Sequence, residues 1–117
     1  MPKKVLIVDD SMVSRMMIKE ILVSRYPDWE CIQAASADKA IEACQNTQFD
    51  YITLDLNMPG RSGLDAAPEI ISNQNGARIA LLTANIQAAT RQKASELGLI
   101  FVAKPINEDS ILAFASS

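Results

Sequence analysis

Val5-Leu6-Ile7-Val8 runs directly into Asp9-Asp10, so the first apolar run of the sequence ends in two carboxylates. Three further apolar runs end at a polar residue in the same way: Tyr51-Ile52-Thr53-Leu54 at Asp55, Ile79-Ala80-Leu81-Leu82 at Thr83, and Leu99-Ile100-Phe101-Val102-Ala103 at Lys104-Pro105. Short runs rich in β-branched residues, separated by stretches with helical periodicity, are typical of strands in a parallel sheet. The sequence therefore predicts an α/β fold.

The polar residues at the ends of these runs are expected to lie close together. Open parallel sheets bind ligands just beyond the carboxyl ends of their strands. Three carboxylates, one hydroxyl and one ammonium would then meet at one edge of the sheet. Clustered carboxylates favour a hard divalent cation, and a nearby lysine favours an anion beside it. The pattern predicts a site for Mg²⁺ and a phosphoryl group.

Length and composition indicate one domain over residues 1–117 of a cytoplasmic protein. Hydrophobic residues make up 49% of the chain, but charges interrupt them often. No apolar stretch approaches the roughly 18 to 20 residues that span a bilayer, so no membrane insertion is expected. The net charge is −3 and no cluster of Lys and Arg lies on one predicted face, which argues against direct nucleic-acid binding.

The chain contains no histidine. This excludes Ser-His-Asp and Cys-His catalysis, most zinc sites and a role as a phosphohistidine donor. Cys31 and Cys44 lack the spacing of a metal site and are interpreted as reduced thiols of the core. The remaining chemistry depends on carboxylates, lysine and threonine.

Five strands alternate with five helices in the predicted structure. Strands are expected at 4–9, 29–34, 50–55, 78–83 and 99–103, and helices at 12–25, 37–45, 64–74 and 86–97, with a last helix capped by Asn107. Right-handed crossovers give a doubly wound, flavodoxin-like parallel sheet with strand order 2-1-3-4-5. Strands 1 and 3 flank the point where the order reverses, so Asp9, Asp10 and Asp55 should lie side by side.

Two of the predicted helices have sequence features that bear on their packing and bounds. In the helix at 12–25, apolar residues recur every three or four positions and are expected to form its inward face: Val13, Met16, Met17, Ile18, Ile21 and Leu22. In the helix at 64–74, Pro68 lacks an N–H and costs about 3 kcal/mol in a regular interior. That helix is expected either to begin late, near Ala66, or to be kinked.

The order of these motifs resembles the response-regulator receiver domain, in particular single-domain regulators of the CheY type. Asp-Asp after the first strand, Asp with Met-Pro-Gly and a later Gly after the third, Thr after the fourth and Lys-Pro after the fifth all occur in the family's order. Each motif alone is weak, but their combination at the correct strand ends is specific. The resemblance covers essentially the whole chain.

The resemblance implies a role for each carboxylate. Asp55 would be the phosphoacceptor, whose ionised carboxylate attacks phosphorus without a general base. Asp10 would bind Mg²⁺ directly and Asp9 largely through water. Asp55 would add another oxygen, and Asn57 its backbone carbonyl.

The resemblance also implies how phosphate is held and sensed. Lys104 would pair with the phosphoryl oxygens, and Thr83 would donate its hydroxyl to them beside the N–H of Ala84. Phe101 would be the switch aromatic, which turns inward when the threonine moves toward phosphate. Pro105 would follow a cis peptide bond that aims the lysine amine.

The implied partners are proteins. A histidine kinase or phosphotransfer protein would donate the phosphoryl group, with Ser11, Met12 and Arg15 contributing to its recognition. A monomeric receiver would then bind an output protein, most simply in a chemotaxis pathway, through a face that includes Ala88, Arg91, Gln92, Ser95, Phe101, Ile106 and Asn107. The only chemistry implied is self-phosphorylation and self-dephosphorylation, not enzymatic turnover.

Alternative interpretations remain open from the sequence. The chain could be a phosphorelay intermediate, or a receiver excised from a larger regulator. A Mg²⁺-dependent phosphatase with an aspartyl-phosphate intermediate would carry a second Asp two positions after the nucleophile, where this chain has Asn57. A nucleotide or flavin module would need a Gly-rich loop after a strand, and no such motif occurs. Asp9-Asp10 could also simply cap a helix.

Overall fold

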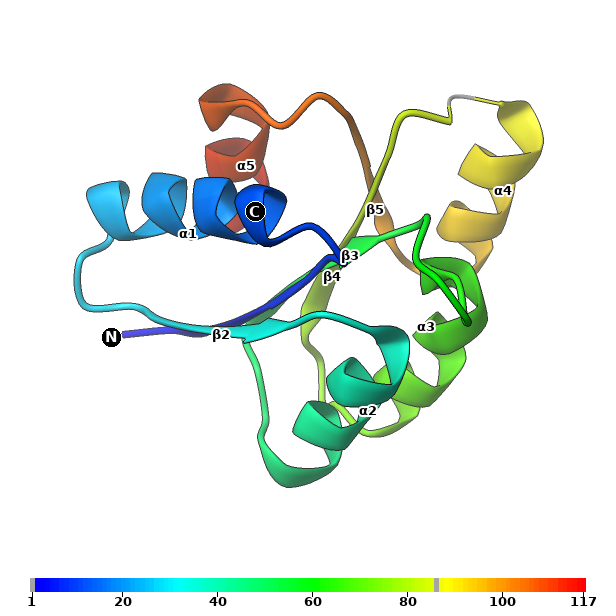
Figure 1. Cartoon of the computed structure of the whole chain (residues 1–117), viewed down its shortest axis with the longest axis horizontal. Coiled ribbons are helices and arrows are strands. Elements are labelled where there is room, and N and C mark those ends of the chain that lie inside the picture. Colours follow the sequence, from blue (N-terminus) through cyan, green and yellow to red (C-terminus); the bar gives the residue numbers. More distant parts are fainter. Residues whose placement is uncertain (1, 86) are drawn as a thin grey trace.

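The computed structural model describes residues 2–85 and 87–117. Within them, five strands and five helices alternate along the chain (Figure 1). Their bounds are β1 (Lys4–Val8), α1 (Met12–Arg25), β2 (Glu30–Ala34), α2 (Ala37–Asn46), β3 (Tyr51–Asp55), α3 (Gly63–Ser72), β4 (Arg78–Thr83), α4 (Ala88–Glu96), β5 (Ile100–Ala103) and α5 (Glu108–Ala115). None of these helices is long and apolar enough to cross a bilayer.

All strand pairs are parallel, and the sheet has the order β2-β1-β3-β4-β5. The predicted fold class and strand order are confirmed. Strands β1 and β3 are neighbours in the register Val8 to Leu54, so the residues that follow them leave the sheet at the same edge. This is the switch point at which ligands bind in open α/β sheets.

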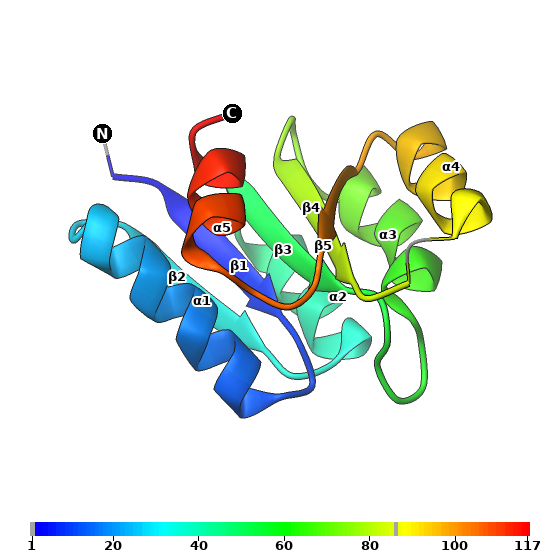
Figure 2. The ribbon, with the colours of Figure 1, turned by 90° about the horizontal axis from the view of Figure 1, so that it is seen from above.

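Helices cover both faces of the sheet, which explains the continuous apolar runs of the strands. On one face, Leu6 and Val8 pack with buried residues of α2 and α3. On the other face, Val5 and Ile7 pack with buried residues of α1 and α5. Figures 1 and 2 both show α1 and α5 side by side on this second face.

The predicted inward face of α1 is only partly correct. Ile18 and Leu22 are buried, whereas Val13, Met16 and Met17 are exposed. Helix α1 packs on the sheet beside α5, so it buries a stripe narrower than its apolar face. Val13, Met16 and Met17 therefore face solvent, whereas Ile21 is half-buried and packs against the core.

Helix α3 begins early, so the predicted late start near Ala66 is wrong. The Ser62 hydroxyl accepts a hydrogen bond of 3.1 Å from the Asp65 N–H and caps the helix. This places Pro68 in the interior of α3, where it has no N–H to donate to the carbonyl four residues earlier. The proline ring is exposed, so it fits without disturbing the core.

Helix α4 begins at Ala88, two residues later than predicted, and Ile86 lies outside the described residues. The Thr83 hydroxyl accepts from the Asn85 N–H at 2.9 Å, and the Asn85 side chain accepts from the Gln87 N–H at 3.0 Å. These side-chain turns compete with the helix for backbone donors. They delay its start.

Candidate functional site

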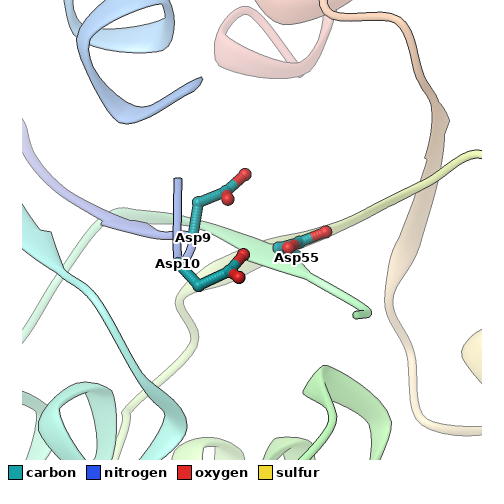
Figure 3. A group of neighbouring side chains, drawn as sticks. All are labelled: Asp9, Asp10 and Asp55. Atoms are coloured by element: carbon teal, nitrogen blue, oxygen red, sulfur yellow. The ribbon is translucent and has the colours of Figure 1, made fainter. Parts of the chain in front are cut away.

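Three carboxylates meet at the carboxyl edge of the sheet. Asp9 and Asp10 follow β1, and Asp55 ends β3. One oxygen from each lies within 4.8 Å of the others, and Figure 3 shows the three side chains turned in the same direction. Asp9 and Asp55 are buried, with 1% and 4% of their surface exposed, while Asp10 is exposed. The predicted convergence is confirmed, and the oxygen donors fit a hard cation.

Asp9 is held by hydrogen bonds to the end of β2 and to the turn before α1. Its N–H donates to the Ala34 carbonyl at 3.1 Å, and its Oδ1 accepts from the Ser11 N–H at 2.9 Å. The cap of α1 is Ser11 itself, whose hydroxyl accepts from the Ser14 N–H. The carboxylate of Asp9 therefore orders the turn before the helix, and Ser11 supplies the cap.

Lys104, which follows the edge strand β5, reaches the carboxylates with its side chain. Its Nζ lies 3.0 Å from Asp55 Oδ1 and 3.4 Å from Asp9 Oδ2. Its backbone N–H donates to the Thr83 carbonyl at 3.0 Å, which fixes it beside the end of β4. The Lys104–Pro105 peptide bond is cis, as the family resemblance implied.

Burial and charge shift the acidities of this site. Removal from water raises the pKa of Asp55, although the hydrogen bond from Lys104 lowers it and the charge of Asp9 raises it further. Burial would lower the pKa of Lys104, but its hydrogen bond to Asp55 and the charges of both carboxylates raise it overall. Lys104 thus stays protonated at neutral pH and offers a fixed positive charge to an anion.

Thr83 is the last residue of the next strand, β4, and Ala84 follows it. In the β3–β4 register, Asp55 pairs with Leu82, so Thr83 is one residue beyond it. The buried Thr83 hydroxyl accepts a hydrogen bond from the Asn85 N–H, which leaves its own proton available to an acceptor.

The loop after β3 depends on a glycine whose role the sequence did not reveal. A Cβ on Gly63 would lie 2.4 Å from the backbone carbonyl oxygen of Asp55. Only glycine therefore allows the first turn of α3 to approach the end of β3 this closely. Asn57 is exposed in this loop, and its backbone N–H contributes to lowering the pKa of Asp55. Spacing alone could not separate Gly63 from an ordinary turn glycine.

Phe101 lies on the edge strand β5, apart from the carboxylates and half-buried. The Arg91 guanidinium of α4 lies over its ring, 4.5 Å from the centroid. A groove of about 430 Å³ adjoins the ring between β5 and α5. Most of its lining comes from apolar or small side chains, including Phe101, Ala113 and Phe114.

The exposed start of α1 borders the acidic site. Its large apolar side chains form what we term the α1 patch: Met12, Val13, Met16 and Met17, which are 62%, 64%, 57% and 46% exposed. Among the described residues, these are the only large hydrophobic side chains with such exposure. The α1 patch begins two positions after Asp10, so it lies next to the carboxylates in the chain.

Comparisons with known proteins agree with this arrangement. The sequence model of the response regulator receiver domain family matches residues 5–116 of this chain. Chemotaxis protein CheY of Bacillus subtilis is 34% identical over 114 residues, covering 96% of this chain and 93% of that protein. The solved structure of chemotaxis protein CheY4 of Vibrio cholerae has a TM-score of 0.87 and 28% identity, covering 99% of this chain and 98% of that one.

A second solved structure is a response regulator from Burkholderia pseudomallei. It was determined with a phosphorylated aspartic acid, a calcium ion and citrate. Its TM-score is 0.86 at 33% identity, covering 95% of this chain and 65% of that one.

Proposed function

Because the chain belongs to the response regulator receiver family, we propose that it is a phosphorylation-dependent switch with Asp55 as the phosphoacceptor. The observation that carries the proposal is the position of the buried Asp55 between two further carboxylates and the Lys104 ammonium. The proposal extends to the whole of residues 1–117 as one receiver domain in the cytoplasm.

The reaction is the transfer of a phosphoryl group from a phosphohistidine of a kinase or phosphotransfer protein. An oxygen of Asp55 forms a bond to phosphorus while the phosphorus–nitrogen bond breaks, and the electron pair stays on the imidazole of the donor, which takes up a proton. Lys104 neutralises charge on the phosphoryl oxygens during transfer and in the product. The hydroxyl of Thr83 and the N–H of Ala84 donate to the same oxygens.

The three carboxylates are suited to hold Mg²⁺. Asp10 and Asp55 would bind it directly, Asp9 largely through water, and Asn57 through its backbone carbonyl. The bound ion would relieve the repulsion between the carboxylates and offset the charge of the phosphoryl oxygens. The Burkholderia relative, whose structure holds both a phosphorylated aspartic acid and a calcium ion, supports a fold that accepts a phosphoryl group and a divalent cation.

Output is proposed to pass through Phe101. Movement of Thr83 toward the phosphoryl group opens space beside β5, and the ring of Phe101 turns inward to fill it. This changes the face of α4, β5 and α5, where the partner binds at residues that include Ala88, Arg91, Gln92, Ser95, Ile106 and Asn107. The similarity to CheY proteins favours a chemotaxis-type output from a monomer, without enzymatic turnover.

The α1 patch is proposed as the docking surface for the phosphodonor. It contains three flexible methionines, which adapt to different apolar partners, and it begins two positions after Asp10 in the chain. A helix of the donor that packs on Met12 and Met16 would place its phosphohistidine over Asp55. The exposure of these side chains in a monomer supports such a contact.

The test is incubation with acetyl phosphate and Mg²⁺, followed by intact mass measurement. We expect one phosphoryl group on the native protein, none on Asp55→Asn, and none when Mg²⁺ is removed by a chelator. An adduct of equal amount on Asp55→Asn would reject Asp55 as acceptor. Steady hydrolysis of a phosphate ester over many cycles would instead indicate the phosphatase alternative.

A further inference from the structure

Arg15 makes two hydrogen bonds that connect α1 with the ends of β1 and β2. Its Nη1 donates to the backbone carbonyl of Asp9, and its Nε donates to the Gln33 side-chain oxygen at 3.0 Å. Arg15 is half-buried and Gln33 is exposed on the edge strand β2. The guanidinium therefore contacts the backbone that carries the carboxylates, and neither of its two bonds goes to a carboxylate.

The bond to the Asp9 carbonyl constrains Asp10 as well. That carbonyl belongs to the peptide plane between the two residues, so fixing it also fixes the N–H and the Cα position of Asp10. The other side of Asp9 is already held, because its N–H donates to Ala34. With Arg15 in place, the turn that presents both carboxylates is anchored at each end.

We propose that Arg15 is a positioning residue for the cation site, and that Gln33 holds its guanidinium in the required orientation. The pair would preorganise the Asp9–Asp10 turn so that Asp10 and Asp55 can bind one Mg²⁺ together. Residues that orient metal ligands without touching the metal typically change its affinity about 10- to 100-fold when replaced. The inference rests on the proposed Mg²⁺ site.

The charge of Arg15 and its positioning role predict opposite changes in Mg²⁺ affinity when the residue is replaced. A guanidinium near three carboxylates repels a divalent cation, so the loss of its charge alone would strengthen Mg²⁺ binding. If Arg15 positions the turn, its loss weakens binding despite the relief of repulsion. Lysine keeps the charge but lacks the planar fork that reaches two acceptors at once, so Arg15→Lys should also weaken binding.

The test is a titration with Mn²⁺, followed by the electron paramagnetic resonance of the free ion, with Mg²⁺ as competitor. We expect Arg15→Gln and Arg15→Lys to bind either ion about tenfold more weakly than wild type. Gln33→Leu should weaken binding about threefold, while Gln33→Glu keeps an acceptor and retains at least wild-type affinity. Lys19→Gln removes one charge from an exposed position of the same helix and should leave affinity unchanged.

Each failure has a distinct meaning. Wild type that binds no cation, or binds it equally well after Asp10→Asn, would overturn the proposed metal site itself. Wild type that requires Asp10, with Arg15→Gln binding as tightly or more tightly, would overturn only the positioning role. Circular dichroism and thermal unfolding without metal establish that the variants are folded. If Arg15→Gln does not fold, the affinities of Gln33→Leu and Gln33→Glu test the positioning role instead, because Gln33 is exposed and its replacement leaves the core intact. Equal affinities in these two variants would overturn the positioning role.

Discussion

The Lys104 ammonium lies 3.0 Å from the Asp55 carboxylate, so the residue after β5 is paired with the last residue of β3. The same ammonium is 3.4 Å from Asp9 and thus bridges two buried acids across the switch point of the sheet. Without a cation, Lys104 supplies the nearest compensation for these charges. If Asp55 is phosphorylated as proposed, the same ammonium lies close enough to pair with the phosphoryl oxygens.

The ionised Asp55 should reduce the stability of the metal-free protein. Burial raises its pKa above the ordinary value of 3.8. At a pH between the unfolded and folded pKa values, the folded state therefore retains a proton that the unfolded chain has lost. A raised pKa stabilises the fold at low pH, and this stabilisation disappears as pH rises through the folded-state value. We expect wild type to lose unfolding free energy relative to Asp55→Asn from about pH 4 upward, until the folded carboxyl has ionised.

Urea unfolding of both proteins at several pH values without Mg²⁺ measures this difference. Acidic groups that do not interact with Asp55 contribute equally to both proteins and cancel in the comparison. A difference that is constant with pH, or that shifts in favour of wild type as pH rises, would contradict a raised pKa of Asp55.

Replacement of Gly63 should disturb the phosphoacceptor directly. Because an added Cβ would lie 2.4 Å from the Asp55 carbonyl, either the end of β3 or the start of α3 must move in Gly63→Ala. A displacement of about 1 Å in a reacting group can lower the rate about 100-fold, so phosphorylation by acetyl phosphate should slow by tenfold or more.

Gly76→Ala is the matched control for this prediction. Gly76 has a positive φ of 87° before β4, with nothing within 4 Å of an added Cβ, so alanine there strains the backbone without approaching Asp55. It should lower stability and leave the phosphorylation rate near that of wild type. Equal rates in Gly63→Ala and Gly76→Ala would show that the close approach at Gly63 does not position the acceptor.

Arg91 should favour the half-buried position that the Phe101 ring has in the structure over the proposed inward position. A cation over an aromatic face contributes about 0.5–1 kcal/mol at an exposed site, which corresponds to a two- to fivefold change in population. Arg91→Gln should therefore raise the inward population of the ring by this factor, as measured from the NMR shifts of Phe101. Lys93→Gln, on the same helix, serves as the control, and an equal shift in both variants would reject a specific contact.

Thr53 carries the one buried side-chain polar atom that has no hydrogen-bond partner within residues 2–85 and 87–117. An unpaired buried hydroxyl costs about 1–3 kcal/mol, and valine has nearly the same shape. We expect Thr53→Val to raise the free energy of unfolding by about 1 kcal/mol in urea, with phosphorylation unchanged. A clear loss of stability would show that the hydroxyl is hydrogen-bonded in solution.

The sequence predicted the sheet well because its central strands, β1, β3 and β4, are buried on both faces. Runs such as residues 5–8 are continuously apolar, and the charged residues Asp9, Asp55 and Lys104 appear at the ends of strands or directly after them. The convergence of Asp9, Asp10 and Asp55 follows from strand order alone. The features that periodicity could not predict depend on tertiary contacts.

Three local features show this limit. The exposure of Met16 depends on how much of α1 the sheet and α5 cover, and the start of α4 depends on side-chain turns at Thr83 and Asn85. The contact of Arg15 with Gln33 joins residues on separate elements, 18 positions apart. No periodic pattern records such a pair.

The most direct test of the account is to locate the phosphoryl group chemically. Borohydride reduces an aspartyl phosphate, with loss of phosphate, to homoserine at the position that was modified. After treatment with acetyl phosphate and Mg²⁺, peptide mass spectrometry should find homoserine at position 55 and at no other aspartate. Homoserine at Asp9 or Asp10, or a phosphorylated protein without homoserine at position 55, would contradict the assignment of Asp55 as phosphoacceptor.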